Sequence, residues 1–390
     1  MSAPGARRRQ PQGDLPGWLG SPEGRRRATV VGGALLLGVL LAMPVGAARP
    51  SALLHTFVLL AVLGLGLRFR VAGLAVAALL VAGVHLRLDM IGVGYSDVLD
   101  TTRRAIEVAL AGGNPYDLGT ALQSPESPPF PYGPLALLWY LPFGDPRAVE
   151  LTISFVILAV LAVRGRLVGL ALFALAPPLL LTASDGSNDH SAGLLLLGAV
   201  LVARRNPLWG AAALAGAACF KPYALAWLPP LVGWAGVSAL APFALASAVL
   251  WGPAILLWGL GSILGSISRA EQIHTSSYYS LAQALEGLTR QALPPALFNG
   301  LRLVLGGALA ALSLLWVRSY HGMLLAGLFI YLATLFAGYW STFAYFAAIA
   351  PLVCWHVDEW LGVAWARVRW PGDPAGRLTA ALDRRWPVRQ

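Results

Sequence analysis

Charged side chains are scarce in this sequence. Asp, Glu, Lys and Arg make up 12% of the 390 residues, whereas a soluble domain carries roughly 25%. The hydrophobic fraction is 57% and the mean hydropathy is +0.67. This balance excludes an ordinary soluble domain and indicates a polytopic membrane protein.

Cysteine and several common motifs are missing or nearly so. The two cysteines, Cys219 and Cys354, both lie in apolar runs, so they indicate small core residues and not a disulfide or metal pair. The short alternating segments of a membrane β-barrel are absent. A glycine-rich nucleotide loop and a nucleophile elbow are absent as well. The chemistry of the chain must therefore be sought in its few polar segments.

Basic residues outnumber acidic ones, with a net charge of +10. They gather at the ends of apolar runs, which is typical of cytoplasmic anchors and not of a nucleic-acid site. The clusters are Arg7–Arg9, Arg25–Arg27, Arg68 and Arg70, Arg164 and Arg166, Arg204 and Arg205, Arg318, and the tail from Arg367 to Arg389.

Apolar runs rich in Leu, Ala, Val and Gly fill most of the chain. A helix needs about 20 apolar residues to cross a bilayer, and small residues allow close helix packing in lipid. The sequence predicts an all-α, polytopic transmembrane bundle of about 12 spans. The runs lie near 28–46, 51–67, 71–88, 147–163, 167–183, 190–203, 207–220, 222–234, 236–259, 296–317, 320–338 and 341–358.

Alternation of these runs predicts the topology. We expect a plasma-membrane protein with a disordered basic tail (1–27), a transmembrane domain (28–358) and a second basic tail (359–390), both tails being cytoplasmic. The polar segments then fall outside and converge on one face. They are 89–146, 184–189 and 260–295, together with a short turn near 339.

Residues 97–111 of the first external segment have helical periodicity. An amphipathic helix on the outer leaflet is expected, ending at Gly112-Gly113. Its apolar face would contain Val98, Ala105, Ile106, Ala109 and Leu110, and its polar face Asp100, Arg103, Arg104 and Glu107. The apolar stretch that begins at Leu135 is too short to span a membrane.

Asp97 opens this helix directly after Ser96, a good cap residue. One interpretation is a second capping residue, because a helix N-terminus favours an anion. The other is a functional carboxylate, since the acid follows an apolar run in a segment dense with polar and aromatic groups.

The external segments resemble those of glycosyltransferase family 87, over roughly residues 90 to 355. The order of acid, amphipathic helix, GGNPYD and PFPYGP resembles the first external loop of that family. Later stretches that resemble it are SNDHSAGLLLLGAVLVARR, AALAGAACFKPYALAWLPPL and HTSSYYSLAQAL. Two departures stand out: three apolar runs precede Asp97 instead of one, and GYWSTFAYFAAIAP lacks the late histidine of many members.

The resemblance implies a GT-C fold and an inverting transfer of a hexose, such as mannose, from a polyprenyl-phosphate donor to an external lipid or glycan acceptor. It also implies that Asp97 is the general base. The reaction would need a base for the acceptor hydroxyl and positive charge for the leaving phosphate.

Lys221 is the leading candidate to bind the donor phosphate. It is the only lysine among 28 basic residues, and it lies at the predicted outer end of its run. A cation within the membrane is costly unless it is paired, and a phosphate is a suitable partner. The alternative is snorkelling to the interface. Arg269 and Arg103, with its neighbour Arg104, are weaker candidates.

Asp185, Asn188, Asp189 and His190 are candidates for binding the sugar or the acceptor, as are His274 and Tyr278. An ordinary polar turn with Asp189 as a helix cap explains the first group equally well. No metal-ligand spacing is present and no cofactor is expected, although a divalent cation stays open.

Two other functions compete with the enzyme. About 12 spans also suit a secondary transporter, but a transporter places ionisable groups near the midplane between repeats. A noncatalytic subunit of an envelope-assembly complex is the third interpretation. Partners are therefore expected to be membrane lipids, a lipid-carried sugar and its acceptor, and not nucleic acid.

Overall fold

The computed structural model describes residues 61, 72–94, 96–120, 127–273 and 279–361. The predicted run near 28–46 lies outside these residues, and so does the run near 51–67 except for residue 61. The N-terminal tail and most of the C-terminal one lie outside them as well. The regular elements of the described residues are all helices, as the sequence predicts.

Fifteen α-helices and three 3-10 helices follow one another in the described residues. They are α4 (Ala72–Asp89), α5 (Asp97–Leu110), η1 (Pro115–Asp117), α6 (Pro134–Tyr140), α7 (Pro146–Val163), α8 (Leu167–Leu175), α9 (Pro177–Asp185), α10 (Asp189–Arg205), α11 (Pro207–Phe220), η2 (Pro222–Trp227), α12 (Leu228–Ala235), η3 (Val237–Ala239), α13 (Leu240–Trp258), α14 (Leu260–Ile273), α15 (Leu281–Thr289), α16 (Pro295–Trp316), α17 (Tyr320–Ala337) and α18 (Phe343–Trp360).

Four of these helices are long and apolar enough to cross a membrane, and a fifth span is possible if α8 and α9 count as one bent unit. The four are Pro146–Val163, Val237–Trp258, Pro295–Trp316 and Tyr320–Ala337. The larger count of about 12 is not confirmed. Proline and glycine interrupt several predicted runs, and the run near 222–234, for example, becomes η2 and the eight-residue α12.

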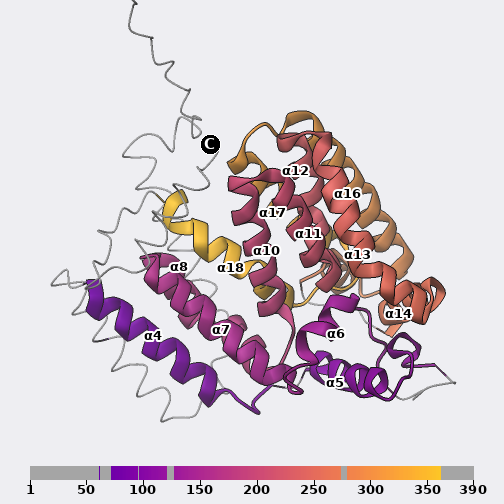
Figure 1. The fold of residues 1–390 in the computed structure, drawn as a ribbon, viewed down its shortest axis with the longest axis horizontal. Coiled ribbons are helices and arrows are strands. Elements are labelled where there is room, and N and C mark those ends of the chain that lie inside the picture. The colour runs from indigo at the N-terminus through magenta and orange to yellow at the C-terminus, as the bar shows by residue number, and fades with distance from the viewer. Residues whose placement is uncertain (1–60, 62–71, 95, 121–126, 274–278, 362–390) are drawn as a thin grey trace, which may run out of the picture.

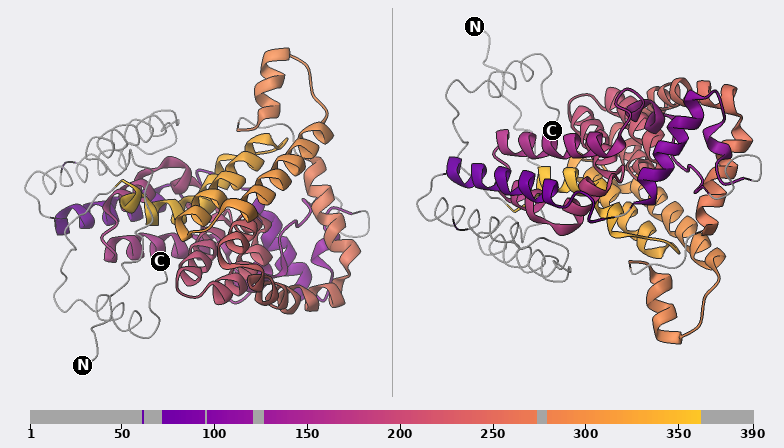
Figure 2. Two further views of the ribbon diagram at one scale, coloured as in Figure 1. Left: turned by 90° about the horizontal axis from the view of Figure 1, so that it is seen from above. Right: turned by 90° about the horizontal axis from the view of Figure 1, so that it is seen from below.

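The helices form two groups that meet at α18 (Figure 1). On one side α4 and α7 pack against each other and against α8. On the other side α10, α11, α13 and α12, α16, α17 pack together, while α5 and α6 lie at one end of the assembly (Figure 1). Helix α15 projects from the body (Figure 2).

The predicted cytoplasmic arginines come together at the other end of the assembly. Arg166 and Arg204 both lie 3.9 Å from Glu359 of α18, and Arg164 lies 5.6 Å from the ring of Trp355. Helix α10 connects the two ends, with Asp189 at its start and Arg204 in its last turn. Polar segments and arginines are thus segregated along the helices, which is compatible with a multi-pass membrane protein.

The amphipathic helix exists as α5, but it packs on protein. It contacts η1, α6 and α7, and it ends before Gly112, whose φ is +78°. The predicted apolar face is correct for Ala105 and Ile106 and wrong for Leu110, which is 70% exposed. Because α5 contacts three protein elements, its buried face differs from the predicted apolar face. It also contains Leu99, Thr101, Thr102 and Val108.

A buried arginine supports the break between α8 and α9, which is bent by 60°. Pro177 and Pro178 have no amide hydrogen, so the carbonyls four residues earlier lose their helical partners. Those carbonyls belong to Phe173 and Ala174, and the fully buried Arg87 of α4 donates to them at 2.6 and 3.4 Å. Arg87 also donates to Ser154 and to its own helix.

Arg87→Ala should therefore destabilise the protein by about 2–4 kcal/mol, because it leaves two buried carbonyls without donors at about 1–3 kcal/mol each. Unfolding in detergent, followed by circular dichroism, would measure the loss. The control is Arg104→Ala, which removes a 2.8 Å exposed pair with Glu107 worth about 0.3–0.5 kcal/mol. Equal losses for the two variants would contradict this role of Arg87.

Candidate functional site

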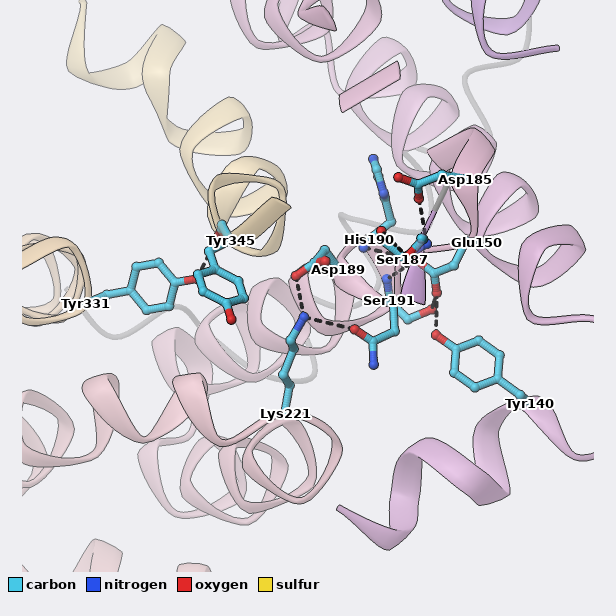
Figure 3. A network of polar contacts seen from close by, with 12 residues as sticks. Tyr140, Glu150, Asp185, Ser187, Asp189, His190, Ser191, Lys221, Tyr331 and Tyr345 are labelled. Atoms are coloured by element: carbon cyan, nitrogen blue, oxygen red, sulfur yellow. Dashed lines mark hydrogen bonds and ion pairs between the residues drawn. The ribbon is translucent and has the colours of Figure 1, made fainter. Parts of the chain in front are cut away.

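Lys221 lies at the centre of a buried polar cluster. It is the C-cap residue of α11, where Pro222 prevents the helix from continuing. Its side chain is only 4% exposed, and its Nζ donates to Asp189 Oδ1 at 2.5 Å and to Asn188 Oδ1 at 2.9 Å (Figure 3). The charge of the only lysine in the chain is thus offset by a carboxylate one position into α10.

Three tyrosine rings surround the same ammonium group. The centroids of Tyr132, Tyr223 and Tyr345 lie 5.4 to 5.6 Å from Nζ, which is the range of cation–π attraction. Tyr331 holds this wall in place, because its hydroxyl donates to the backbone carbonyl of Tyr345 at 2.7 Å. Lys221 is therefore fixed on one side by oxygen acceptors and on the other by aromatic faces.

A cavity of about 510 Å³ adjoins Lys221. Its aromatic lining comes from α17, α18, η2 and the segments beside them, and consists of Tyr132, Tyr223, Tyr331, Tyr339, Trp340 and Tyr345. Asn299 and Arg302 of α16 add polar groups to the lining. Leu225 and Leu303 also line the cavity and are 45% and 74% exposed, so it opens to the apolar outer surface of the helices.

Glycine allows the segment that carries Tyr132 to approach α11. A Cβ on Gly133 would lie 1.7 Å from the carbonyl oxygen of Cys219, so no other residue fits here without movement of the backbone. The segment PFPYGP is thereby held against the end of α11, next to Lys221.

Asp97 is exposed at the first position of α5. Its preceding residue, Ser96, makes no capping bond and instead contacts the Ser187 hydroxyl at 3.1 Å, which ties the start of α5 to the turn before α10. Burial raises the pKa of the Tyr132 hydroxyl well above its usual value, and the charges of Tyr345, Asp189 and Asp97 act in the same direction. Tyr132 therefore stays a hydrogen-bond donor at neutral pH, whereas Asp97 is not among the residues that line the cavity.

The residues of the polar turn divide between Lys221 and the core. Asn188 and Asp189 hold Lys221, whereas Asp185 closes its own turn by accepting the backbone amide of Ser187 at 2.8 Å. The ring of His190 is fully buried and lies 5.5 Å from the ring of Phe173, pointing away from Lys221 (Figure 3). Gly186 follows Asp185 at the end of α9 and has a φ of +85°. This conformation permits the tight turn between α9 and α10.

The two arginine candidates bind neighbouring protein groups. Arg103 pairs with Asp145 at 2.8 Å, which connects α5 to the start of α7. Arg269 donates to the backbone carbonyl of Tyr116 at 2.6 Å and so anchors the segment that carries Tyr116 on α14. Neither side chain is part of the cavity lining. His274 and Tyr278 lie outside the described residues.

The sequence did not predict the roles of Glu150 and Arg302. It also did not predict the tyrosine cage, the set of three rings around Lys221 that belong to Tyr132, Tyr223 and Tyr345. Glu150 and Arg302 are charged residues inside the runs 147–163 and 296–317, and an ionisable group in such a run is a signal of a buried partner or a site. The tyrosines gave no comparable signal, because tyrosine is common at membrane interfaces.

Within the described residues no three His, Cys, Asp or Glu side chains come together as metal ligands. Two polar atoms beside Lys221 nevertheless lack a hydrogen-bond partner. Asp189 Oδ2 and Asn188 Nδ2 are buried without hydrogen-bond partners there, a cost that a hydroxyl-bearing ligand could remove. The ammonium group also has three donors, of which these two residues take two. One donor of the ammonium group is therefore left for the oxygen of a ligand.

No family model, curated protein or solved structure matches this chain.

The buried ion pair generates a prediction about stability. Lys221→Met leaves the Asp189 charge buried and unpaired, which should cost about 3–5 kcal/mol. The double variant Lys221→Met/Asp189→Asn removes the charge and should recover at least half of that loss. Chemical unfolding of both variants in detergent provides the measurement, and a double variant no more stable than the single one would refute the pairing.

Proposed function

We propose that the protein is a multi-pass membrane glycosyltransferase of the GT-C type. It transfers a hexose, with mannose as the leading candidate, from a polyprenyl-phosphate donor to a lipid or glycan acceptor outside the plasma membrane. The observation that carries the proposal is the cavity beside Lys221, which combines a buried cation, aromatic walls and an apolar opening.

Each part of such a donor has a matching surface. The phosphate can take the third donor of Lys221, and Arg302, which lines the same cavity, would be a second cationic partner. Sugar rings pack on aromatic faces, and Tyr223 and Tyr345 present such faces beside Lys221. The isoprenoid chain would leave through the opening at Leu225 and Leu303, both exposed on the apolar surface.

Asp97 is the proposed base. It removes the proton of the acceptor hydroxyl as the acceptor oxygen forms its bond to the anomeric carbon. The bond from that carbon to the phosphate oxygen breaks, and the electron pair leaves with polyprenyl phosphate, which Lys221 and Arg302 stabilise. Configuration at the anomeric carbon is inverted by this single displacement.

The charge distribution supports an external site. The cavity lies toward the end of α10 that carries Asp189, and Arg204 and its partners gather at the opposite end. Under the positive-inside rule the arginine end is cytoplasmic. The full topology of about 12 spans, with both termini inside, belongs to the same proposal.

A secondary transporter is the second candidate, because the Lys221–Asp189 pair lies in the bundle near the broken unit α8–α9. Transporters bind substrates at such interruptions. A transporter would move its substrate without forming a glycosidic bond, so assays of purified protein separate the two functions.

The activity test uses purified protein, polyprenyl-phosphate-[14C]mannose and a membrane lipid extract as acceptor source. Wild type should form a labelled product, and Asp97→Asn should reduce kcat by about 100- to 10,000-fold, the usual contribution of general base catalysis. Asp100→Asn, one turn later on the exposed face of α5, is the matched control and should retain activity.

Several hexose donors would be tested in the same way. No transfer from any of them by the wild type, or equal transfer by Asp97→Asn, would refute the enzymatic assignment. Uptake of a free sugar into proteoliposomes, without product formation, would favour the transporter instead.

The phosphate role of Lys221 is tested by binding. Lys221→Ala should weaken binding of a polyprenyl phosphate at least tenfold and leave acceptor affinity within twofold, because the lysine contacts only the donor in the proposed arrangement. Calorimetry in detergent measures the first value and the acceptor KM reports the second. Unchanged polyprenyl-phosphate affinity would remove Lys221 from the donor site.

A further inference from the structure

Glu150 of α7 is a fully buried carboxylate with four hydrogen bonds. Its Oε2 accepts the backbone amides of His190 at 3.0 Å and Ser191 at 3.1 Å. Its Oε1 accepts the hydroxyl of Tyr140 at 2.6 Å and also the hydroxyl of Ser191 (Figure 3). These donors come from two other elements, α6 and α10, so one carboxylate connects three helices.

The two amides are the second and third of α10, which a helix cap ordinarily satisfies. Asn188 occupies the cap position, yet its side chain makes no capping bond, because its oxygen accepts from Lys221. Glu150 supplies the cap from another helix. Asn188 is thereby released to hold Lys221, and Asp189 is fixed one position later.

The same carboxylate fixes the aromatic side of the site. Tyr140 ends α6, the helix that follows Tyr132 after one glycine and begins at Pro134. Its neighbour Trp139 donates to the Ser191 hydroxyl at 3.0 Å, which gives α6 a second connection to α10. Glu150 thus fixes the position of Asn188 and Asp189, the oxygen partners of Lys221, relative to the ring of Tyr132.

We propose that Glu150 is a positioning residue that sets the environment of Lys221 without touching it. Its effect on the protein's chemistry passes through Asn188 and Asp189. The part of this inference that concerns donor use rests on the proposed function, whereas the effect on Lys221 itself does not.

The chain contains a matched control for helix capping alone. Asp358 of α18 accepts the second and third amides of α8, from Val168 at 3.0 Å and Gly169 at 2.9 Å. It is 3% exposed, like Glu150 it reaches from another helix, and it does not line the cavity beside Lys221. Loss of either carboxylate removes an interhelical cap, but the cap from Glu150 lies at the end of α10 that carries Asn188 and Asp189, whereas the cap from Asp358 lies at the start of α8.

Because Lys221 is the only lysine, amine acetylation followed by mass spectrometry reports on this site directly. The variants are Glu150→Gln, Glu150→Ala, Asp358→Asn and Asp358→Ala in the full chain, each checked for monodisperse elution. Glu150→Ala should raise the acetylation rate of Lys221 at least tenfold, and Glu150→Gln, which keeps one acceptor, should raise it less. Both Asp358 variants should change it less than twofold.

Equal acceleration in the Glu150 and Asp358 series would mean general loosening and would overturn the proposal. An unchanged rate in Glu150→Gln and in folded Glu150→Ala would overturn it as well. If Glu150→Ala fails to fold, the comparison of Glu150→Gln with Asp358→Asn decides.

Donor use gives the second readout. With polyprenyl-phosphate-[14C]mannose, Glu150→Gln should raise the donor KM at least fivefold and leave the acceptor KM within twofold, whereas Asp358→Asn should leave both unchanged. A wild type without transfer would count against the proposed function only, since the acetylation result tests the position of Lys221 independently. A Glu150→Gln enzyme with wild-type donor KM would contradict the extension to donor binding.

Discussion

Helix ends that are buried inside a bundle need hydrogen-bond partners, and this requirement organises the structure. Water cannot reach these amides and carbonyls, and each unsatisfied group costs about 1–3 kcal/mol. Charged side chains from other helices supply the partners. Glu150 caps α10, Asp358 caps α8, and Arg87 binds the carbonyls of Phe173 and Ala174 that precede the proline pair.

These interactions explain why a chain with so little charge keeps charged residues within its apolar runs. A full charge on a helix end is attracted by the helix dipole as well as by individual hydrogen bonds. Partners such as Arg87 stabilise the break at α8–α9 by satisfying the carbonyls that the proline pair leaves without helical donors. Short, broken helices in turn bring the polar turn before α10 into the interior, where Asn188 and Asp189 meet Lys221.

The geometry of the site around Lys221 depends on these interactions at helix ends. An N-cap asparagine is normally occupied by its own helix, but the cap from Glu150 leaves Asn188 free to bind the ammonium group. The tyrosine cage is held in addition by the hydroxyl of Tyr331 and by the close approach of Gly133 to α11. Because Lys221 is held rigidly beside a cavity, the proposed binding of an anionic donor would need little reorganisation.

The sequence by itself determined the helical class, most helix positions and the segregation of arginines from the polar segments. Apolar runs, prolines and glycines act locally: Pro222 ends α11, and the glycine after α5 stops that helix. It also singled out Lys221, Asn188 and Asp189, since a lone lysine and a polar turn stand out against apolar surroundings.

Only the tertiary structure decided that these three residues meet, and that Arg103 and Arg269 bind protein groups instead. The partners of Lys221 are 32 and 33 positions away, and Val168 and Asp358 are separated by 190. Periodicity gives the face of a helix but not the neighbour that covers it, which is why the buried face of α5 was only partly predicted. Contacts of this range depend on how the helices pack, because the hydrophobic pattern that forms each helix is compatible with many partners.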